Sequence, residues 1–203
     1  YAAGDAFGVQ YEFKDGYRVE SSLSEIPDWP LGGVSDDTLL TLLSIKALDS
    51  HSPAAARTRF IELLKENLPV LRGLGPTTRA AVGLPVKESE RHFIGNSNGA
   101  MMRTALMGMA FKSDDDLNRR QWISEIALAT HSHERAVATS LIASKLFSQA
   151  LQDPNIDIEK VAEGEAQAIG YADFFSTHFD EKAQVSLDPL HTLKTVIAIA
   201  VTS

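Results

Sequence analysis

The sequence predicts an all-α fold, and three observations lead to that prediction. Apolar residues recur at helical spacing in most segments of the chain. No segment alternates apolar and polar residues as a half-buried strand does. Proline, glycine or small polar residues stand at the ends of the helical segments, where they start or stop a helix. With 203 residues and 44% hydrophobic content, we expect one domain over 1–203.

The first expected element is a helix that begins near Gly4. Gly4 and Gly8 lie four residues apart, so on a helix they form a smooth stripe that another helix can approach closely. Asp5 and Glu12 lie seven residues apart and share a face if the helix continues to Glu12. Helix packing explains the glycines, whereas the shared face would present two acids to one cleft.

Two strongly periodic helices follow, over residues 36–48 and 53–68. Leucine and isoleucine recur along one side of the first, and Ser35 stands where an N-cap belongs, with two aspartates in the first turn. Pro69 stops the second helix.

Residues 69–98 contain many glycines and prolines, which favour a long structured loop over long regular elements. Beyond this loop the periodicity of apolar residues returns. It predicts helices over 99–111, 118–129, 133–151, 158–175 and 189–202.

Composition excludes several classes of protein. The chain has no cysteine, which rules out disulfides, zinc–thiolate sites and cysteine nucleophiles and favours a cytoplasmic location. A net charge of -8 argues against a protein that coats nucleic acid. No apolar run approaches the length of a membrane span, so no membrane partner is expected. A small-molecule or protein substrate fits better.

The segment Ser35-Asp36-Asp37-Thr38 combines adjacent carboxylates with a hydroxyl on each side. These are hard oxygen ligands of the kind that Mg²⁺ prefers, and Glu12 can add a third carboxylate if the fold brings it close. A capped helix start explains the same residues, because acids complement the positive end of the helix dipole. The metal interpretation predicts a magnesium-dependent hydrolase and needs further ligands from water or substrate.

The segment 95–103 places small polar residues directly before a helix. Backbone amides at such a start converge and favour an anion, so a diphosphate would fit there. The alternative is that Ser97 or Asn98 caps the helix while Met101 and Met102 pack in the core.

Two histidines, His131 and His133, stand near a predicted helix boundary. Their spacing puts them on different sides of a helix, so a zinc pair is not expected. His131 can hydrogen-bond a ribose or stack on a base. A buried histidine satisfied by the backbone is the alternative.

The order of these motifs resembles the ADP-ribosylglycohydrolase family. A Gly-Asp-Ala-x-Gly helix with an acid seven residues after its Asp comes first, then Ser-Asp-Asp-Thr and an Arg-Gly-Leu-Gly-Pro-Thr-Thr loop at 72–78. Gly-Asn-x-x-Gly-Ala-Met-Met-Arg and Thr-His-x-His follow. The resemblance implies a compact domain of orthogonal helices and two Mg²⁺ ions in a cleft. It also implies hydrolysis of the bond between ADP-ribose and an acceptor, with ADP-ribosylated arginine on protein as the expected substrate.

The resemblance also implies roles for individual residues. Ser35, Asp36 and Asp37 match the family's Thr-Asp-Asp metal ligands, with serine in the usual place of threonine. Glu12 matches an acid beside the metals that is assigned to gating or acid–base work, so Glu12, Asp36 and Asp37 are the expected catalytic residues. The expected ligand-binding residues are Asn96, Ser97, Asn98, Gly99, Met101 and His131.

The sequence departs from the family's pattern of motifs at one point. The family's second acidic motif, Gly-Gly-Asp-x-Asp-Thr, is absent, and residues 187–196 resemble the region shortly before it. We therefore expect a domain that is incomplete at its C-terminus. A catalytically impaired protein that binds ADP-ribose and an immunity or interaction protein remain as alternatives.

Overall fold

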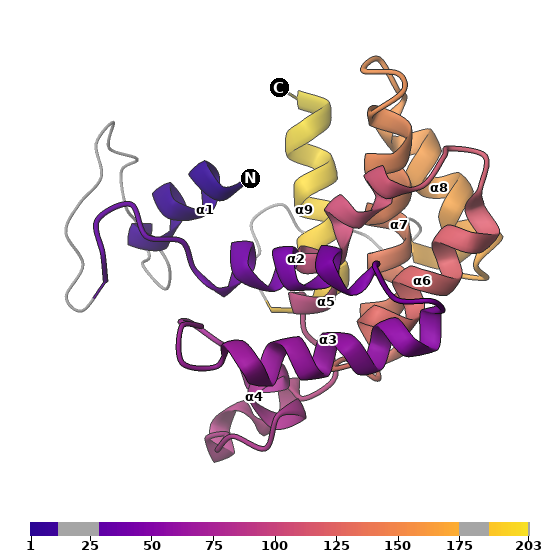
Figure 1. Cartoon of the computed structure of the whole chain (residues 1–203). Coiled ribbons are helices and arrows are strands. Elements are labelled where there is room, and N and C mark those ends of the chain that lie inside the picture. Colours follow the sequence, from indigo (N-terminus) through magenta and orange to yellow (C-terminus); the bar gives the residue numbers. More distant parts are fainter. Residues whose placement is uncertain (12–28, 175–186, 203) are drawn as a thin grey trace.

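The computed structural model describes residues 1–11, 29–174 and 187–202, and within these ranges it contains helices and no strand (Figure 1). The α-helices are α1 (Ala2–Gly8), α2 (Asp36–Ala47), α3 (Pro53–Asn67), α4 (Pro76–Ala81), α5 (Gly99–Thr104), α6 (Asp116–Leu128), α7 (Glu134–Ala150), α8 (Ile158–Ala168) and α9 (Pro189–Thr202). The 3₁₀ helices are η1 (Val9–Tyr11), η2 (Glu88–Phe93), η3 (Ala105–Ala110) and η4 (Ala172–Phe174). The prediction of an all-α fold is confirmed.

Side chains that cap helix starts explain why several helices begin where they do. The Ser35 hydroxyl accepts a hydrogen bond from the backbone amide of Asp37 at the start of α2, at 3.1 Å. Ser52 caps α3 and Asp157 caps α8 in the same way. Each cap satisfies an amide that the helix itself leaves without an acceptor.

The core consists of two large apolar clusters that meet at α7. In Figure 1, α2 and α3 run across the view, whereas α7 and α9 stand upright. Phe60 and Leu64 of α3 are fully buried with Ile126 of α6 in the first cluster, to which α7 adds Leu141. The second cluster joins α5, α7, α8 and α9 and includes Ile142. The central position of α7 therefore fixes how the two halves of the core pack.

The predicted helix over 99–111 is divided into α5 and η3. A Cβ atom at Gly108 would lie 1.9 Å from the carbonyl oxygen of Ser144 on α7. The backbone of η3 therefore lies directly on the backbone of α7, which a side chain at position 108 would prevent. The apolar period of 99–111 does not distinguish a continuous α-helix from this tighter arrangement.

Two other boundaries differ from the sequence prediction. The expected loop 69–98 contains α4 and η2, which are only six residues long each. The helix expected over 158–175 ends at Ala168, because Gly170 takes a positive φ of 79° and Tyr171 donates its amide to the Ala166 carbonyl at 2.7 Å. This left-handed glycine ends the helix.

Among the described residues, no helix has the length and apolar content needed to cross a membrane.

Candidate functional site

The start of α2 is held by an acid from α1. The carboxylate oxygens of Asp5 lie 3.0 and 3.2 Å from the backbone nitrogen of Ser35, and one of them lies 3.1 Å from that of Thr38. Asp5 therefore supplies acceptors to backbone amides that the first turn of α2 leaves without a partner inside the helix. This contact ties α1 to the segment that carries the two aspartates.

Ser35, Asp36 and Asp37 occupy the first turn of α2, next to the loop around Gly73. Ser35 is 1% exposed, whereas the two aspartates are partly buried. A Cβ atom at Gly73 would lie 3.0 Å from the Oδ1 atom of Asp36, and Gly73 has a φ of +82°. The glycine thus leaves space for the Asp36 carboxylate.

Tyr1 connects these acids to α5. Its hydroxyl donates to the carbonyl oxygen of Met102 at 3.3 Å. Burial raises the pKa of Tyr1 to about 12, and the negative charges of Asp37, Asp5 and Asp36 add to that rise. Because α2 also packs on α5, the acids lie beside the helix that follows loop 95–99.

The backbone of loop 95–99 is held at both of its ends. Gly95 donates its amide to the Thr77 hydroxyl at 3.2 Å and accepts from the His133 amide at 3.0 Å. A Cβ atom at Gly95, where φ is +83°, would lie 2.8 Å from the Ser132 hydroxyl. At the other end, the amide of Asn98 donates to the carbonyl of Leu187 at 2.9 Å.

His131 lies behind this loop and is fully buried. Its Nε2 atom is 2.9 Å from the Ser97 hydroxyl, and its Nδ1 atom is 2.7 Å from the Thr130 hydroxyl. Burial, together with the positive charge of Arg103, holds the pKa of His131 well below 6.5. The ring is therefore neutral at pH 7, and side chains rather than the backbone satisfy it.

The expected ligand-binding residues thus differ in accessibility. Ser97 and Met101 are buried at 6% and 7% exposure, and Met101 packs in the second apolar cluster. Asn96 and Asn98 are partly buried. Gly99 lies against the His131 ring, whose Nε2 atom would be 3.3 Å from a Cβ atom at that position.

Arg103 is a functional candidate that the sequence analysis missed. It is 1% exposed, and its guanidinium donates to the carbonyls of Gly99, Ile126 and Ala127 at 3.1, 2.8 and 3.3 Å. Burial lowers its pKa to about 9, so it is still a cation at pH 7. The motif Gly-Asn-x-x-Gly-Ala-Met-Met-Arg ends at Arg103, but an arginine is normally expected at the surface, so the motif does not reveal that this side chain is buried.

The oxygen donors at the start of α2 suit a hard cation, although they form only part of a coordination sphere. Asp36 and Asp37 supply carboxylates, and the Ser35 hydroxyl keeps one lone pair after accepting from Asp37. Among the described residues, no group of three or more acids or histidines could hold a metal ion. Glu12 lies outside the described residues.

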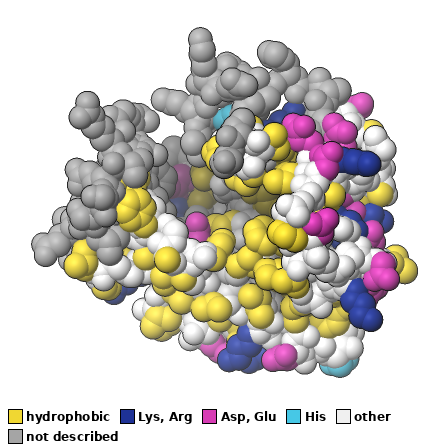
Figure 2. All heavy atoms as spheres, turned by 90° about the horizontal axis from the view of Figure 1, so that it is seen from above, with side chains coloured by type: hydrophobic (Ala, Val, Ile, Leu, Met, Phe, Trp, Pro, Cys, Tyr) yellow, Lys and Arg dark blue, Asp and Glu magenta, His cyan; other side chains and the backbone are white. Residues whose placement is uncertain are grey.

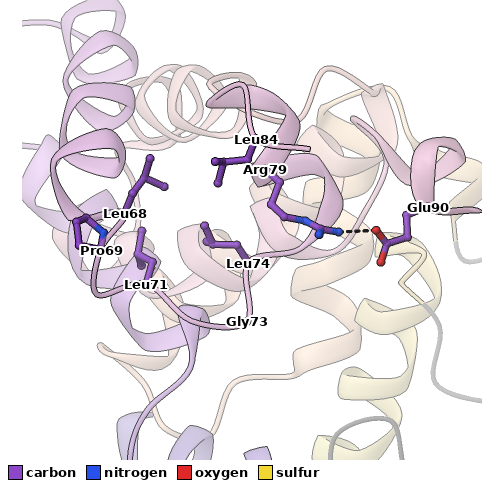
Figure 3. Close-up of a pocket in the computed structure, with 8 residues that line it drawn as sticks. All are labelled: Leu68, Pro69, Leu71, Gly73, Leu74, Arg79, Leu84 and Glu90. Atoms are coloured by element: carbon purple, nitrogen blue, oxygen red, sulfur yellow. Dashed lines mark hydrogen bonds and ion pairs between the residues drawn. The ribbon is translucent and has the colours of Figure 1, made fainter. Parts of the chain in front are cut away.

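A separate hollow of about 640 Å³ opens beside Gly73, and four of its eight lining residues are leucines (Figure 3). Arg79 and Glu90 form an ion pair at its edge. Seen from above, the described part of the molecule carries hydrophobic side chains over the middle of the face and charged ones along the right-hand edge (Figure 2).

Comparison with known families gives one decisive match. The model of the ADP-ribosylglycohydrolase family matches residues 1–197. The chain belongs to the ADP-ribosylglycohydrolase family. Membership assigns it glycohydrolase activity on ADP-ribose conjugates, in a family that is generally metal-dependent. No curated protein matches the chain.

Proposed function

We propose that this ADP-ribosylglycohydrolase uses Mg²⁺ to cleave the bond between ADP-ribose and arginine side chains of modified proteins. The observation that carries the proposal is the position of Asp36 and Asp37 at the start of α2, which packs on α5 directly after loop 95–99. The two aspartates and the small polar residues of loop 95–99 lie far apart in the sequence. The fold brings them near each other because α2, which carries the aspartates, packs on α5, which follows the loop.

Ser35, Asp36 and Asp37 are the proposed metal ligands, at a site proposed to hold two ions. Bound there, Mg²⁺ would bind ribose hydroxyls and lower the pKa of a water molecule. Asp5 keeps the first turn of α2 in place by accepting the amides of Ser35 and Thr38.

Loop 95–99 is the proposed site for the diphosphate and the distal ribose. Asn96, Ser97, Asn98, Gly99, Met101 and His131 remain the proposed ligand-binding set. Because Met101 and His131 are buried, we assign them to the support of the loop. The partly buried Asn96 and Asn98 are the better candidates for direct contact.

Cleavage of a ribosyl bond builds positive charge at C1 and the ring oxygen, so the leaving group needs a proton and the ribose needs a fixed orientation. We assign Glu12 to general acid or base catalysis. The guanidine that leaves becomes a stable cation once protonated. Hydrolysis of ADP-ribosylarginine by a Glu12→Gln variant at near wild-type rate would remove Glu12 from this role.

Isothermal titration with ADP-ribose, with and without Mg²⁺, tests the proposed function. Binding that Mg²⁺ strengthens, together with release of ADP-ribose from ADP-ribosylarginine, supports it. Binding that ignores Mg²⁺, without turnover, indicates a protein that only binds ADP-ribose. Absence of binding indicates an immunity or interaction protein.

We also propose a single domain and a cytoplasmic location, as the composition suggests.

A further inference from the structure

A continuous line of buried hydrogen bonds runs behind loop 95–99, and its direction can be worked out from both ends. At one end, the Thr77 hydroxyl lies 2.9 Å from the Phe93 carbonyl, which can only accept. The proton of Thr77 is therefore committed to Phe93. The contact of 3.1 Å between the hydroxyls of Thr77 and Ser97 then requires Ser97 to be the donor.

The next contact follows from that assignment. Because Ser97 has given its proton to Thr77, its oxygen can only accept from the Nε2 atom of His131, 2.9 Å away. His131 must then carry its ring proton on Nε2. The amide of Gly95 donates to the remaining lone pair of Thr77 at 3.2 Å, so that hydroxyl is fully used.

The opposite end gives the same answer independently. The guanidinium of Arg103 can only donate, and its NH1 group lies 3.5 Å from the Nδ1 atom of His131. A proton on Nδ1 would face this cation, so Nδ1 is the unprotonated nitrogen, and the Thr130 hydroxyl, 2.7 Å from the same atom, is the donor in that contact. The guanidinium itself is held by the carbonyls of Ile126 and Ala127, at the C-terminal end of α6 where the helix dipole favours a cation.

We propose that His131 is a positioning residue for loop 95–99, with its ring proton fixed on Nε2 by Arg103. This line of hydrogen bonds, which passes through Ser97 and Thr77, holds the loop in a fixed position relative to α6. Ser97 keeps no proton for an anion, so its hydroxyl can serve a ligand only as an acceptor. A phosphate at this loop must be bound by other groups, whereas a ribose hydroxyl could still donate to Ser97.

The assignment of the ring proton is tested without any ligand. A two-bond ¹H–¹⁵N correlation spectrum of the chain with ¹⁵N-labelled histidine at pH 7 distinguishes the two neutral tautomers and the cation. We expect the signal that disappears in the His131→Gln variant to be that of the Nε2–H tautomer. The Nδ1–H tautomer or an imidazolium at position 131 would overturn the inference.

The positioning role rests on the proposed function and is tested at Thr77, which lies outside the proposed ligand-binding set. Thr77→Val removes the hydroxyl, whereas Thr77→Ser keeps it. We expect Thr77→Val to raise both the Kd for ADP-ribose and the KM for ADP-ribosylarginine about tenfold, with kcat changed less than about twofold. Thr77→Ser should restore wild-type values.

The neighbouring Thr78 supplies a matched control, because it is also buried in α4 and is not one of the hydroxyls that form the line of hydrogen bonds behind loop 95–99. Thr78→Val should leave Kd and KM unchanged. A folded Thr77→Val protein that binds ADP-ribose like the wild type would overturn the positioning role. If the wild-type chain does not bind ADP-ribose, the proposed function fails, while the histidine spectrum still decides the proton assignment.

Discussion

The carboxylate of Asp5 lies against the backbone amide of Ser35, with oxygen–nitrogen distances of 3.0 and 3.2 Å. An acid on α1 thus stabilises the first turn of α2, in which Asp36 and Asp37 stand. The geometry of the proposed metal ligands therefore depends on a residue that is not itself a proposed ligand.

We expect Asp5→Ala to lower the free energy of unfolding by about 1–2 kcal/mol, because the amides of Ser35 and Thr38 lose their acceptor. Urea unfolding followed by circular dichroism measures this loss. Asp49→Ala removes an exposed acid beyond the end of α2 and should change stability by less than about 0.5 kcal/mol. Equal effects of the two substitutions would argue against the cap.

Gly73 offers a test of the space beside Asp36. In Gly73→Ala the new Cβ atom would lie 3.0 Å from Asp36 Oδ1, while Gly83→Ala places a Cβ atom in open space at a similar φ of +78°. Both variants should lose about 1 kcal/mol of stability through backbone strain. We expect Gly73→Ala, but not Gly83→Ala, to need a higher Mg²⁺ concentration for half-maximal hydrolysis of ADP-ribosylarginine, measured by titrating Mg²⁺. Matching titrations for both variants would contradict this expectation.

Gly108 tests the contact between η3 and α7. We expect Gly108→Ala to lower stability by about 3 kcal/mol or more, because its Cβ atom would overlap the Ser144 carbonyl. In Gly164→Ala, by contrast, the new Cβ atom meets nothing within 4 Å, so that α8 should gain about 0.5–1 kcal/mol. Thermal unfolding of the two variants measures both effects. A stable Gly108→Ala protein would show that η3 is not held this closely.

The burial of His131 predicts a pH dependence of stability. Its pKa is held well below 6.5 in the folded state, so below pH 6.5 the unfolded chain binds a proton that the folded chain does not. Stability should therefore fall as pH drops below 6.5, by up to about 1.4 kcal/mol per pH unit. Urea unfolding at several pH values should show this slope in the wild type and a shallower one in His131→Gln. The same slope in both proteins would count against a buried neutral ring.

The sequence predicted the long helices well because their apolar period and caps are local properties. The predicted helices over 36–48, 53–68, 118–129, 133–151 and 189–202 correspond to α2, α3, α6, α7 and α9, with ends that differ by two residues at most. The division of 99–111 into α5 and η3 depends on the approach of Gly108 to Ser144, a contact between distant parts of the chain. Local periodicity contains no information about it.

The candidate site shows the same division between local and distant information. The cap at Ser35 and the acids after it follow from a short motif, and the order of motifs predicted the family correctly. The buried position of His131 depends on Arg103 and Ser97, which lie 28 and 34 residues away in the chain. The role of Glu12 remains a prediction, since that residue lies outside the described ranges.

Release of ADP-ribose from ADP-ribosylarginine, followed in Mg²⁺ and in excess EDTA, tests the central claim most directly. We predict release by the wild type that EDTA abolishes, and a loss of about 100-fold or more in Asp36→Asn and Asp37→Asn. The control variant Asp49→Asn changes an exposed acid beyond the end of α2 and should keep the wild-type rate. Release that continues unchanged in EDTA, or in the double variant of Asp36 and Asp37, would contradict the proposal that these aspartates hold a catalytic Mg²⁺.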